Sequence, residues 1–254
     1  MQMKNFLLFS FLLFSIIFSN ATYSQKTNKS FEGTITYENT YLCDDKRIDL
    51  QFLNMLPKTQ TFFIKGDKAK LIVENIGIGN SIIADGNAKI KYQLEYIADS
   101  IIAIKYIESD LVEMQKKQDS IISKQIKTDV KYTNDKKTIA GYECFSAIIT
   151  ASHINGSVSN DTVWFNEEMF STGMNLIIEN PLNIKGSQME FSSKMEIPLN
   201  AQGDIASIII FSKVKEITKK KISDEVFEIP KKCKVIAVKE YIKQMQLEQN
   251  NAKK

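Results

Sequence analysis

Apolar and polar side chains alternate with a period of two over most of the chain after Lys29, and this pattern restricts the possible folds more than any other feature. In the first such stretch Phe31, Ile35 and Tyr37 fall on one side, whereas Glu32 falls on the other. Successive side chains of a β-strand point to opposite faces of a sheet. The pattern therefore predicts a chain built mainly of strands that each bury one face.

Turn-forming residues join several of these stretches and predict β-hairpins. A Gly-Asp pair separates strands predicted over residues 61–65 and 68–74, and an Asp-Gly-Asn sequence separates strands predicted over residues 82–84 and 88–96. Alternation continues in residues 101–107, 126–132, 138–150, 158–165, 186–197 and 205–217. About ten strands favour a mostly β fold class with a single large curved antiparallel sheet or an incomplete β-barrel.

Two segments have helical spacing instead. Residues 109–113 have the sequence of a capping box, with Asp110 as N-cap and Glu113 at the third helical position, which predicts a helix that begins here. The second segment, residues 238–249, carries one apolar stripe formed by Val238, Ile242 and Met245. We therefore expect one or two helices packed on the sheet. Because no linker-like stretch interrupts the pattern, residues 30–250 are predicted to form a single domain.

The N-terminus has the three parts of a secretory signal peptide. Lys4 precedes an apolar run over residues 6–18, and small or polar residues follow. The run is shorter than the roughly 20 residues of a membrane-spanning helix. Cleavage is expected after Ser24, with residues 19–21 as a second possible site, so residues 1–24 are predicted to be removed. The remaining chain is expected to be soluble, in the periplasm or secreted, without a transmembrane segment.

Cysteine content and charge exclude several functions. The 3 cysteines, Cys43, Cys144 and Cys233, allow at most one internal disulfide, and the sequence does not select the pair. Cys43 lies too far from the signal peptide to carry a lipid anchor. The 33 Lys and Arg residues nearly balance the 30 Asp and Glu residues, so no nucleic-acid partner is expected. The lysines at 219–221 are interpreted as a solvated strand end, with a lipid or acidic partner as the alternative.

No group of residues predicts catalysis, a metal site or a cofactor. His153 is the single histidine, and it lies among turn formers, where a solvated loop histidine is the better interpretation. The adjacent carboxylates at 44–45 and at 167–168 would point to opposite faces of a strand, or to solvent from a loop. We therefore expect a protein that is not an enzyme.

One stretch between predicted strands is unusually rich in large apolar residues and contains Gly173. It is predicted to be irregular and to fold over one face of the sheet. Core packing is the default interpretation, and the alternative is an apolar pocket or lid, because flexible methionines suit ligands of variable shape. The candidate ligand-binding residues are Met169, Phe170, Met174, Leu176 and Ile178.

Four segments carry a resemblance to a known family: Thr-Ile-Ala-Gly-Tyr-Glu-Cys at 138–144, Thr-Val-Trp-Phe-Asn-Glu-Glu at 162–168, Ile-Lys-Gly-Ser-Gln-Met-Glu-Phe at 184–191 and Lys-Ile-Ser-Asp-Glu-Val-Phe-Glu-Ile-Pro at 221–230. In order and spacing they resemble a large domain-of-unknown-function family of exported proteins related to the GLPGLI family. The resemblance implies a fold like that of the periplasmic lipoprotein carrier LolA, an incomplete antiparallel barrel with an apolar concave face. It implies no established activity and no catalytic residues.

Three hypotheses about function follow. The first is a non-enzymatic envelope protein that binds a lipid, a lipidated protein or another apolar ligand in the concave face of the open barrel. The second is an envelope scaffold that meets a protein partner through a sheet edge or through residues 169–178. The third, an enzyme with an unrecognised arrangement, ranks last because the sequence nominates no converging ionisable groups.

Overall fold

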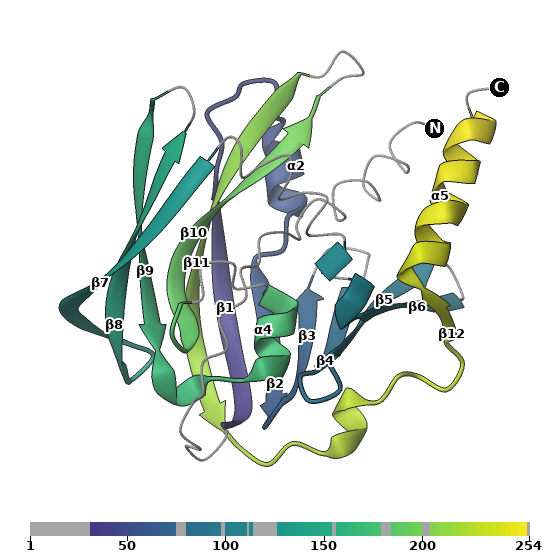
Figure 1. The fold of residues 1–254 in the computed structure, drawn as a ribbon, viewed down its shortest axis with the longest axis horizontal. Coiled ribbons are helices and arrows are strands. Elements are labelled where there is room, and N and C mark those ends of the chain that lie inside the picture. The colour runs from purple at the N-terminus through teal and green to yellow at the C-terminus, as the bar shows by residue number, and fades with distance from the viewer. Residues whose placement is uncertain are drawn as a thin grey trace.

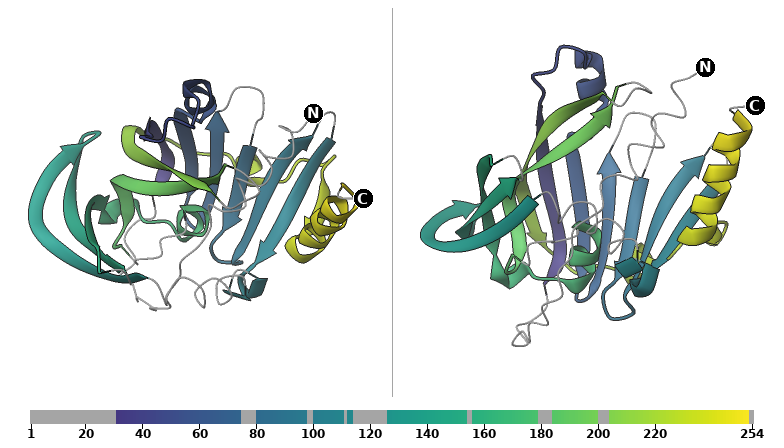
Figure 2. Two further views of the ribbon diagram at one scale, coloured as in Figure 1. Left: turned by 90° about the horizontal axis from the view of Figure 1, so that it is seen from above. Right: turned by 45° about the horizontal axis from the view of Figure 1, so that its top comes forward.

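The fold is a single large sheet, seen in a computed structural model that describes residues 31–74, 80–97, 100–110, 112–113, 126–153, 156–178, 184–199 and 204–252 (Figure 1). The 12 strands follow the order β12-β6-β5-β4-β3-β2-β1-β11-β10-β9-β8-β7. They are β1 (Glu32–Leu42), β2 (Thr59–Lys65), β3 (Lys68–Glu74), β4 (Asn80–Asp85), β5 (Ile90–Ile97), β6 (Ser100–Ile107), β7 (Ile126–Ile139), β8 (Tyr142–His153), β9 (Val158–Asn166), β10 (Ser187–Pro198), β11 (Ile205–Lys219) and β12 (Lys234–Ala237). The sheet is curved and not closed, with its two edge strands apart (Figure 2). The predicted mostly β fold class is confirmed.

Residues 108–110 and 112–113 are helical, and five further helical segments accompany the sheet in the described part of the chain. They are α2 (Leu50–Met55), the 3₁₀ turn η2 (Glu167–Met169), α4 (Thr172–Ile178), the 3₁₀ turn η3 (Asp224–Phe227) and α5 (Val238–Ala252). Among the described residues, none of the helices has both the length and the apolar character that crossing a membrane requires.

Sheet neighbours are mostly neighbours in sequence as well, which is why short turns suffice to connect them. Two pairings are exceptions: β1 pairs antiparallel with β11 and joins the two halves of the sheet, and β12 pairs parallel with β6 at one edge. Both predicted hairpins are confirmed, since Lys65 pairs with Lys68 and Asp85 pairs with Ile90 across their turns.

The strand predicted over residues 138–150 is wrong in one respect, because a turn interrupts it. Ala140 and Gly141 have φ angles of 48° and 85° and connect β7 to β8. Two successive residues with positive φ form the tight turn that matches the twist of a hairpin. The sequence signal for this turn is the Ala-Gly pair. It was missed because the alternation of apolar and polar residues continues on both sides of the pair.

The main core lies on one face of the sheet, which we call the inner face. It contains the residues whose alternation predicted a shared face, including Ile35, Tyr37, Ala69, Leu71 and Val73. The Tyr37 hydroxyl is buried and donates to the Gln188 carbonyl oxygen over 2.8 Å, so its polar atom is satisfied in apolar surroundings. Figure 2 shows α4 inside the curve that this face forms.

The opposite face of β4, β5 and β6 is covered by the segment that contains η3. Ile222 and Phe227 pack there on Ile83, Leu94 and Ala103. This cover decides the orientation of β5: its apolar residues pack under η3, and its alternate residues therefore point to the inner face. We refer to this second layer as the outer core.

The helix predictions are partly confirmed. The stripe formed by Val238, Ile242 and Met245 packs α5 against the sheet, as expected. The other helix begins at Glu108, directly after β6, so the prediction of Asp110 as its N-cap is wrong. Asp110 is buried, and its carboxylate pairs instead with the Lys239 ammonium of α5 at 3.2 Å. Residues 114–122 of that prediction lie outside the described residues.

Candidate functional site

Four of the candidate ligand-binding residues, Met169, Met174, Leu176 and Ile178, lie in or against the main core on the inner face. Met169 and Met174 are 1% exposed, and Phe170, Leu176 and Ile178 are half-buried. The stretch predicted to be irregular is in fact helical over α4, which packs across β2, β3 and β4. It therefore occupies the middle of the inner face with its own apolar side chains, as a plug.

Two glycines let α4 approach the sheet closely. A Cβ atom at Gly173 would lie 2.3 Å from the Asp67 carbonyl oxygen, and one at Gly86 would lie 2.0 Å from the Thr172 hydroxyl oxygen. Both distances are far below a van der Waals contact. The N-terminal end of α4 thus rests directly on the turns of the two N-terminal hairpins, at positions where only glycine fits.

Hydroxyl groups fix the same end of the plug. Ser171 donates to the Gly66 carbonyl oxygen over 2.9 Å, and its hydroxyl accepts from the Met174 amide over 3.3 Å as the helix cap. Thr172 donates to the Asp67 carboxylate over 2.7 Å, and Ser187 donates to the Met169 carbonyl oxygen over 2.7 Å. In contrast, no polar contact to the sheet is described for residues 176–178, so the C-terminal end is held by apolar packing.

Next to the plug, β5 presents a row of polar side chains to the inner face. Lys91 stands opposite Ala84, a residue of the inner core, and opposite Tyr106 of β6. Lys91 is 6% exposed, and its ammonium lies 5.2 Å from the centroid of the Tyr106 ring. The row continues along the strand through Gln93 and Glu95.

The far end of the row is tied to α5. Glu95 accepts a 2.9 Å hydrogen bond from the Tyr241 hydroxyl and one of 3.3 Å from the Gln93 amide. Burial raises the pKa of Glu95, and the bond from Tyr241 counteracts part of that increase. Burial also raises the pKa of Tyr241, and the nearby Glu95 carboxylate adds to this effect. The raised pKa of Tyr241 keeps its hydroxyl protonated, so Tyr241 remains a donor over the whole physiological range.

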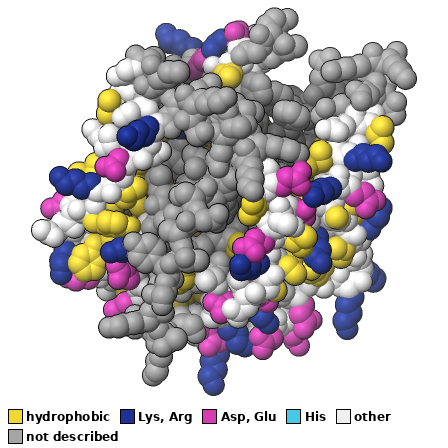
Figure 3. All heavy atoms as spheres, viewed as in Figure 1, with side chains coloured by type: hydrophobic (Ala, Val, Ile, Leu, Met, Phe, Trp, Pro, Cys, Tyr) yellow, Lys and Arg dark blue, Asp and Glu magenta, His cyan; other side chains and the backbone are white. Residues whose placement is uncertain are grey.

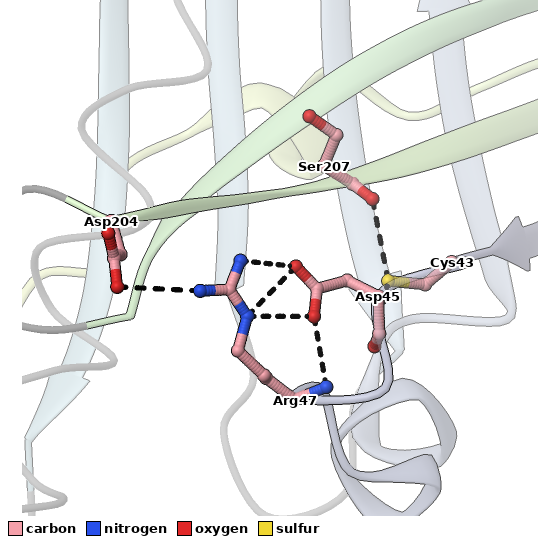
Figure 4. Close-up of polar contacts among 5 residues, drawn as sticks. All are labelled: Cys43, Asp45, Arg47, Asp204 and Ser207. Atoms are coloured by element: carbon pink, nitrogen blue, oxygen red, sulfur yellow. Dashed lines mark hydrogen bonds and ion pairs between the residues drawn. The ribbon is translucent and has the colours of Figure 1, made fainter.

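A separate hollow of about 200 Å³ lies beside α2. Its apolar wall contains Phe52, Ile197 and Leu199, and its rim carries Arg47, whose guanidinium binds the Asp45 carboxylate at 2.7 Å and reaches Asp204 at 3.4 Å (Figure 4). The arginine thus links the segment before α2 to the end of the β10–β11 hairpin. Because its donors already face two carboxylates, we interpret it as a structural clamp.

The clamp gives a pH-dependent prediction. The hydrogen bonds from Arg47 lower the pKa of Asp45 to about 2. Since the pKa is depressed on folding, the interaction stabilises the protein above the unfolded pKa of roughly 4 and is lost as the pH falls through about 2. Carboxyl NMR should show Asp45 titrating near pH 2, and Arg47→Gln should raise this midpoint toward 4. Asp204→Asn, which removes only the longer contact, should leave the midpoint nearly unchanged; equal midpoints in all three proteins would contradict the assignment.

A second hollow, of about 480 Å³, lies where β8 begins and β9 ends. Gly141, Tyr142, Glu143, Phe145, Asn166, Glu167 and Glu168 line it. Asn166 orders this region, because its amide donates to the Glu143 carbonyl oxygen and its oxygen accepts from the Glu168 amide. Glu167 and Glu168 are exposed, in agreement with their interpretation as solvated carboxylates. Because both carboxylates are exposed, Glu167 and Glu168 do not form a buried pair of acid and base.

The three cysteines lie in different parts of the structure. Cys144 is buried in the inner core, Cys233 borders the outer core, and Cys43 packs near α2 with its thiol 3.4 Å from the Ser207 carbonyl oxygen (Figure 4). All three are free thiols, so the structure joins no pair. Within the described residues no group of His, Cys, Asp and Glu side chains could hold a metal ion. His153 ends β8, and its side chain lies outside the described part.

Among the described residues, an apolar patch lies on the exposed side of β11 and β1. On β11 the residues that point away from the core include Ile209 and Phe211, which are 38% and 46% exposed, and Leu42 of β1 stands opposite Ile209. The edge strand β7, by contrast, carries a bulge between Tyr132 and Lys136 and several lysines, both of which discourage pairing with another strand. Lysines and acidic side chains are mixed over the described surface in Figure 3.

No protein-family model matches the chain, and no curated protein matches it either. The resemblance to the exported family related to GLPGLI therefore stays a prediction. The signal peptide over residues 1–24 also stays a prediction, because residues 1–30 lie outside the described part.

Proposed function

We propose that this protein is a non-enzymatic, exported envelope protein that binds a lipid or another apolar ligand on the inner face of its open sheet. One observation carries the proposal: the centre of that face is covered by α4, a short plug of low helix propensity that contains Gly173 and Asn175. A sheet that only needed a core could be closed by its own strands or by a longer helix.

The plug suits exchange with a ligand because its two ends are held differently. Hydrogen bonds and glycine contacts fix its N-terminal end. At the other end, Leu176, Ile177 and Ile178 make no polar contact with the described part of the sheet, so they can separate from it without breaking one. The uncovered surface would be apolar, with Phe62, Leu71 and Val73 beneath the ligand. An acyl chain that took the place of the plug would restore the buried apolar area, at about 25 cal/mol per Å².

Native mass spectrometry of the protein purified from its own envelope tests the proposal. We expect a mass above that of the processed chain, and organic extraction should release a lipid or acyl species and return the protein to its bare mass. A bare mass in the first spectrum, together with no uptake of added decanol, would reject the proposal. The bare mass would also show whether cleavage occurs after Ser24.

A scaffold role is the second candidate, and the exposed patch around Phe211 favours it. The patch differs from the surfaces expected from the sequence, because residues 169–178 are buried or half-buried and the β7 edge is protected. Phe211→Glu separates the two functions: it should abolish capture of an envelope protein if the patch is an interface, and it should leave decanol binding unchanged.

A further inference from the structure

The apolar surface beneath the plug is narrow, which limits the size of a ligand that takes the place of the plug. Phe62, Leu71 and Ile82 stand side by side on β2, β3 and β4, because each is the register partner of the next. We call these three residues the floor. Neighbouring strands lie about 5 Å apart, so the floor is about 10 Å wide. It ends at β5, where Gln93 stands opposite Ile82.

Two features border the floor. The side-chain amide of Gln93 donates to the Glu95 carboxylate over 3.3 Å and accepts from the Tyr106 hydroxyl over 3.3 Å. An alkyl chain that extended over Gln93 would leave an apolar surface for a polar one. In the other direction, the fixed end of α4 rests on β3, since a Cβ atom at Gly173 would lie 2.8 Å from the Ala69 amide nitrogen. The space for a ligand is therefore the part that the C-terminal end of α4 fills.

The side chains at this end of α4 set the volume of that space. Leu176, Ile177 and Ile178 carry four side-chain carbon atoms each; Ile177 is 8% exposed, and the other two are half-buried. Protein interiors are packed as closely as organic crystals, so a smaller ligand leaves a cavity and a larger one projects into water. The three side chains are therefore replaced by about 12 apolar carbon atoms.

We infer that the ligand places a single alkyl chain of about 12 carbon atoms on the floor, and that it is not a lipid with two long chains. The inference rests on the proposed function, because it gives the size of the ligand that takes the place of the plug. Each methylene group that reaches the floor strengthens binding about fourfold, and each one beyond it stays in water and adds little.

Calorimetric titration with a series of straight-chain alcohols tests this size, with the longest members delivered from a cyclodextrin buffer. From octanol to dodecanol the affinity should rise about fourfold for each added carbon atom. From dodecanol to hexadecanol it should change by less than about twofold in total. Titration with 1-decanoylglycerol and 1,2-didecanoylglycerol extends the test to a second chain, which should strengthen binding by less than about twofold.

Leu71→Ala tests whether the floor sets the limit. The substitution removes three carbon atoms beneath the plug, so the affinity should go on rising to a chain about three carbon atoms longer than dodecanol. Ile83→Ala is the matched control, because Ile83 is similarly buried but packs in the outer core. This variant should keep the limit at dodecanol.

Each outcome decides one question. An affinity that rises without a break to hexadecanol, or a second chain that contributes as much as the first, would overturn the size and leave the proposed function intact. Failure of every alcohol and glyceride to bind would overturn both. The wild-type series decides the size even if Leu71→Ala does not fold. If Leu71→Ala folds and keeps the wild-type limit, or if both variants shift it equally, the floor does not set the size and the inference is wrong.

Discussion

Gly173→Ala should lower the free energy of unfolding by about 2 kcal/mol, because overpacking of this kind costs roughly 1–3 kcal/mol. In an exposed helix the same change would stabilise the protein by up to about 1 kcal/mol, since alanine is the better helix former. Here the new methyl group would lie 2.3 Å from the Asp67 carbonyl oxygen, and backbone on both sides would have to move. Urea unfolding followed by circular dichroism gives the difference.

Asn175→Ala provides the control for this prediction. It makes a similar change of helix propensity in α4, and the residue is only half-buried. We expect this variant to change the stability by less than about 0.5 kcal/mol or to increase it. If Gly173→Ala behaved like Asn175→Ala, the close approach of the plug to the sheet would be wrong.

Met174→Ala should have the second large effect, and it should act on stability and binding in opposite directions. Truncation of a fully buried methionine costs about 2–5 kcal/mol, because the removed atoms leave a cavity. The same truncation weakens the plug that competes with the ligand. We therefore expect a lower free energy of unfolding together with tighter binding of decanol, measured by calorimetry.

Ile208→Ala separates binding from general destabilisation. Ile208 is also fully buried, but it lies in the cluster beside α2 and away from the plug. Its truncation should lower the stability to a similar extent and leave the decanol affinity unchanged. If both variants bound decanol equally well, the increase would come from loosening of the whole protein, and α4 would not be the competing element.

The strands were predictable because their signal is local. In β3, for example, Ala69, Leu71 and Val73 occupy every second position, and the same residues are buried in the structure. The parallel pairing of β12 with β6 was not predictable, since β12 has only four residues and its partner lies far away in sequence. The extended conformation of such a short strand is stabilised by its pairing with the strand at the edge of the sheet.

The candidate site was only half predictable. The apolar composition around Met174 indicated a segment that covers the sheet, but its helical form was missed because Thr172, Gly173 and Asn175 are poor helix formers. Tertiary contacts with the hairpin turns stabilise this helix. The inward position of Lys91 was missed for a different reason: alternation shows which residues of β5 share a face, and only the cover by η3 decides which of the two faces points inward.

Hydrogen exchange of the α4 amides, with and without saturating decanol, tests most directly whether a ligand replaces the plug. The Asn175 amide, which donates to the Ser171 carbonyl oxygen over 3.0 Å, reports on the helix, and the amides of α5 serve as an internal reference. Faster exchange in α4 with unchanged exchange in α5 is the expected result. Unchanged or slower exchange in α4 with decanol bound would show that the plug stays on the sheet, which would contradict the proposed mode of binding.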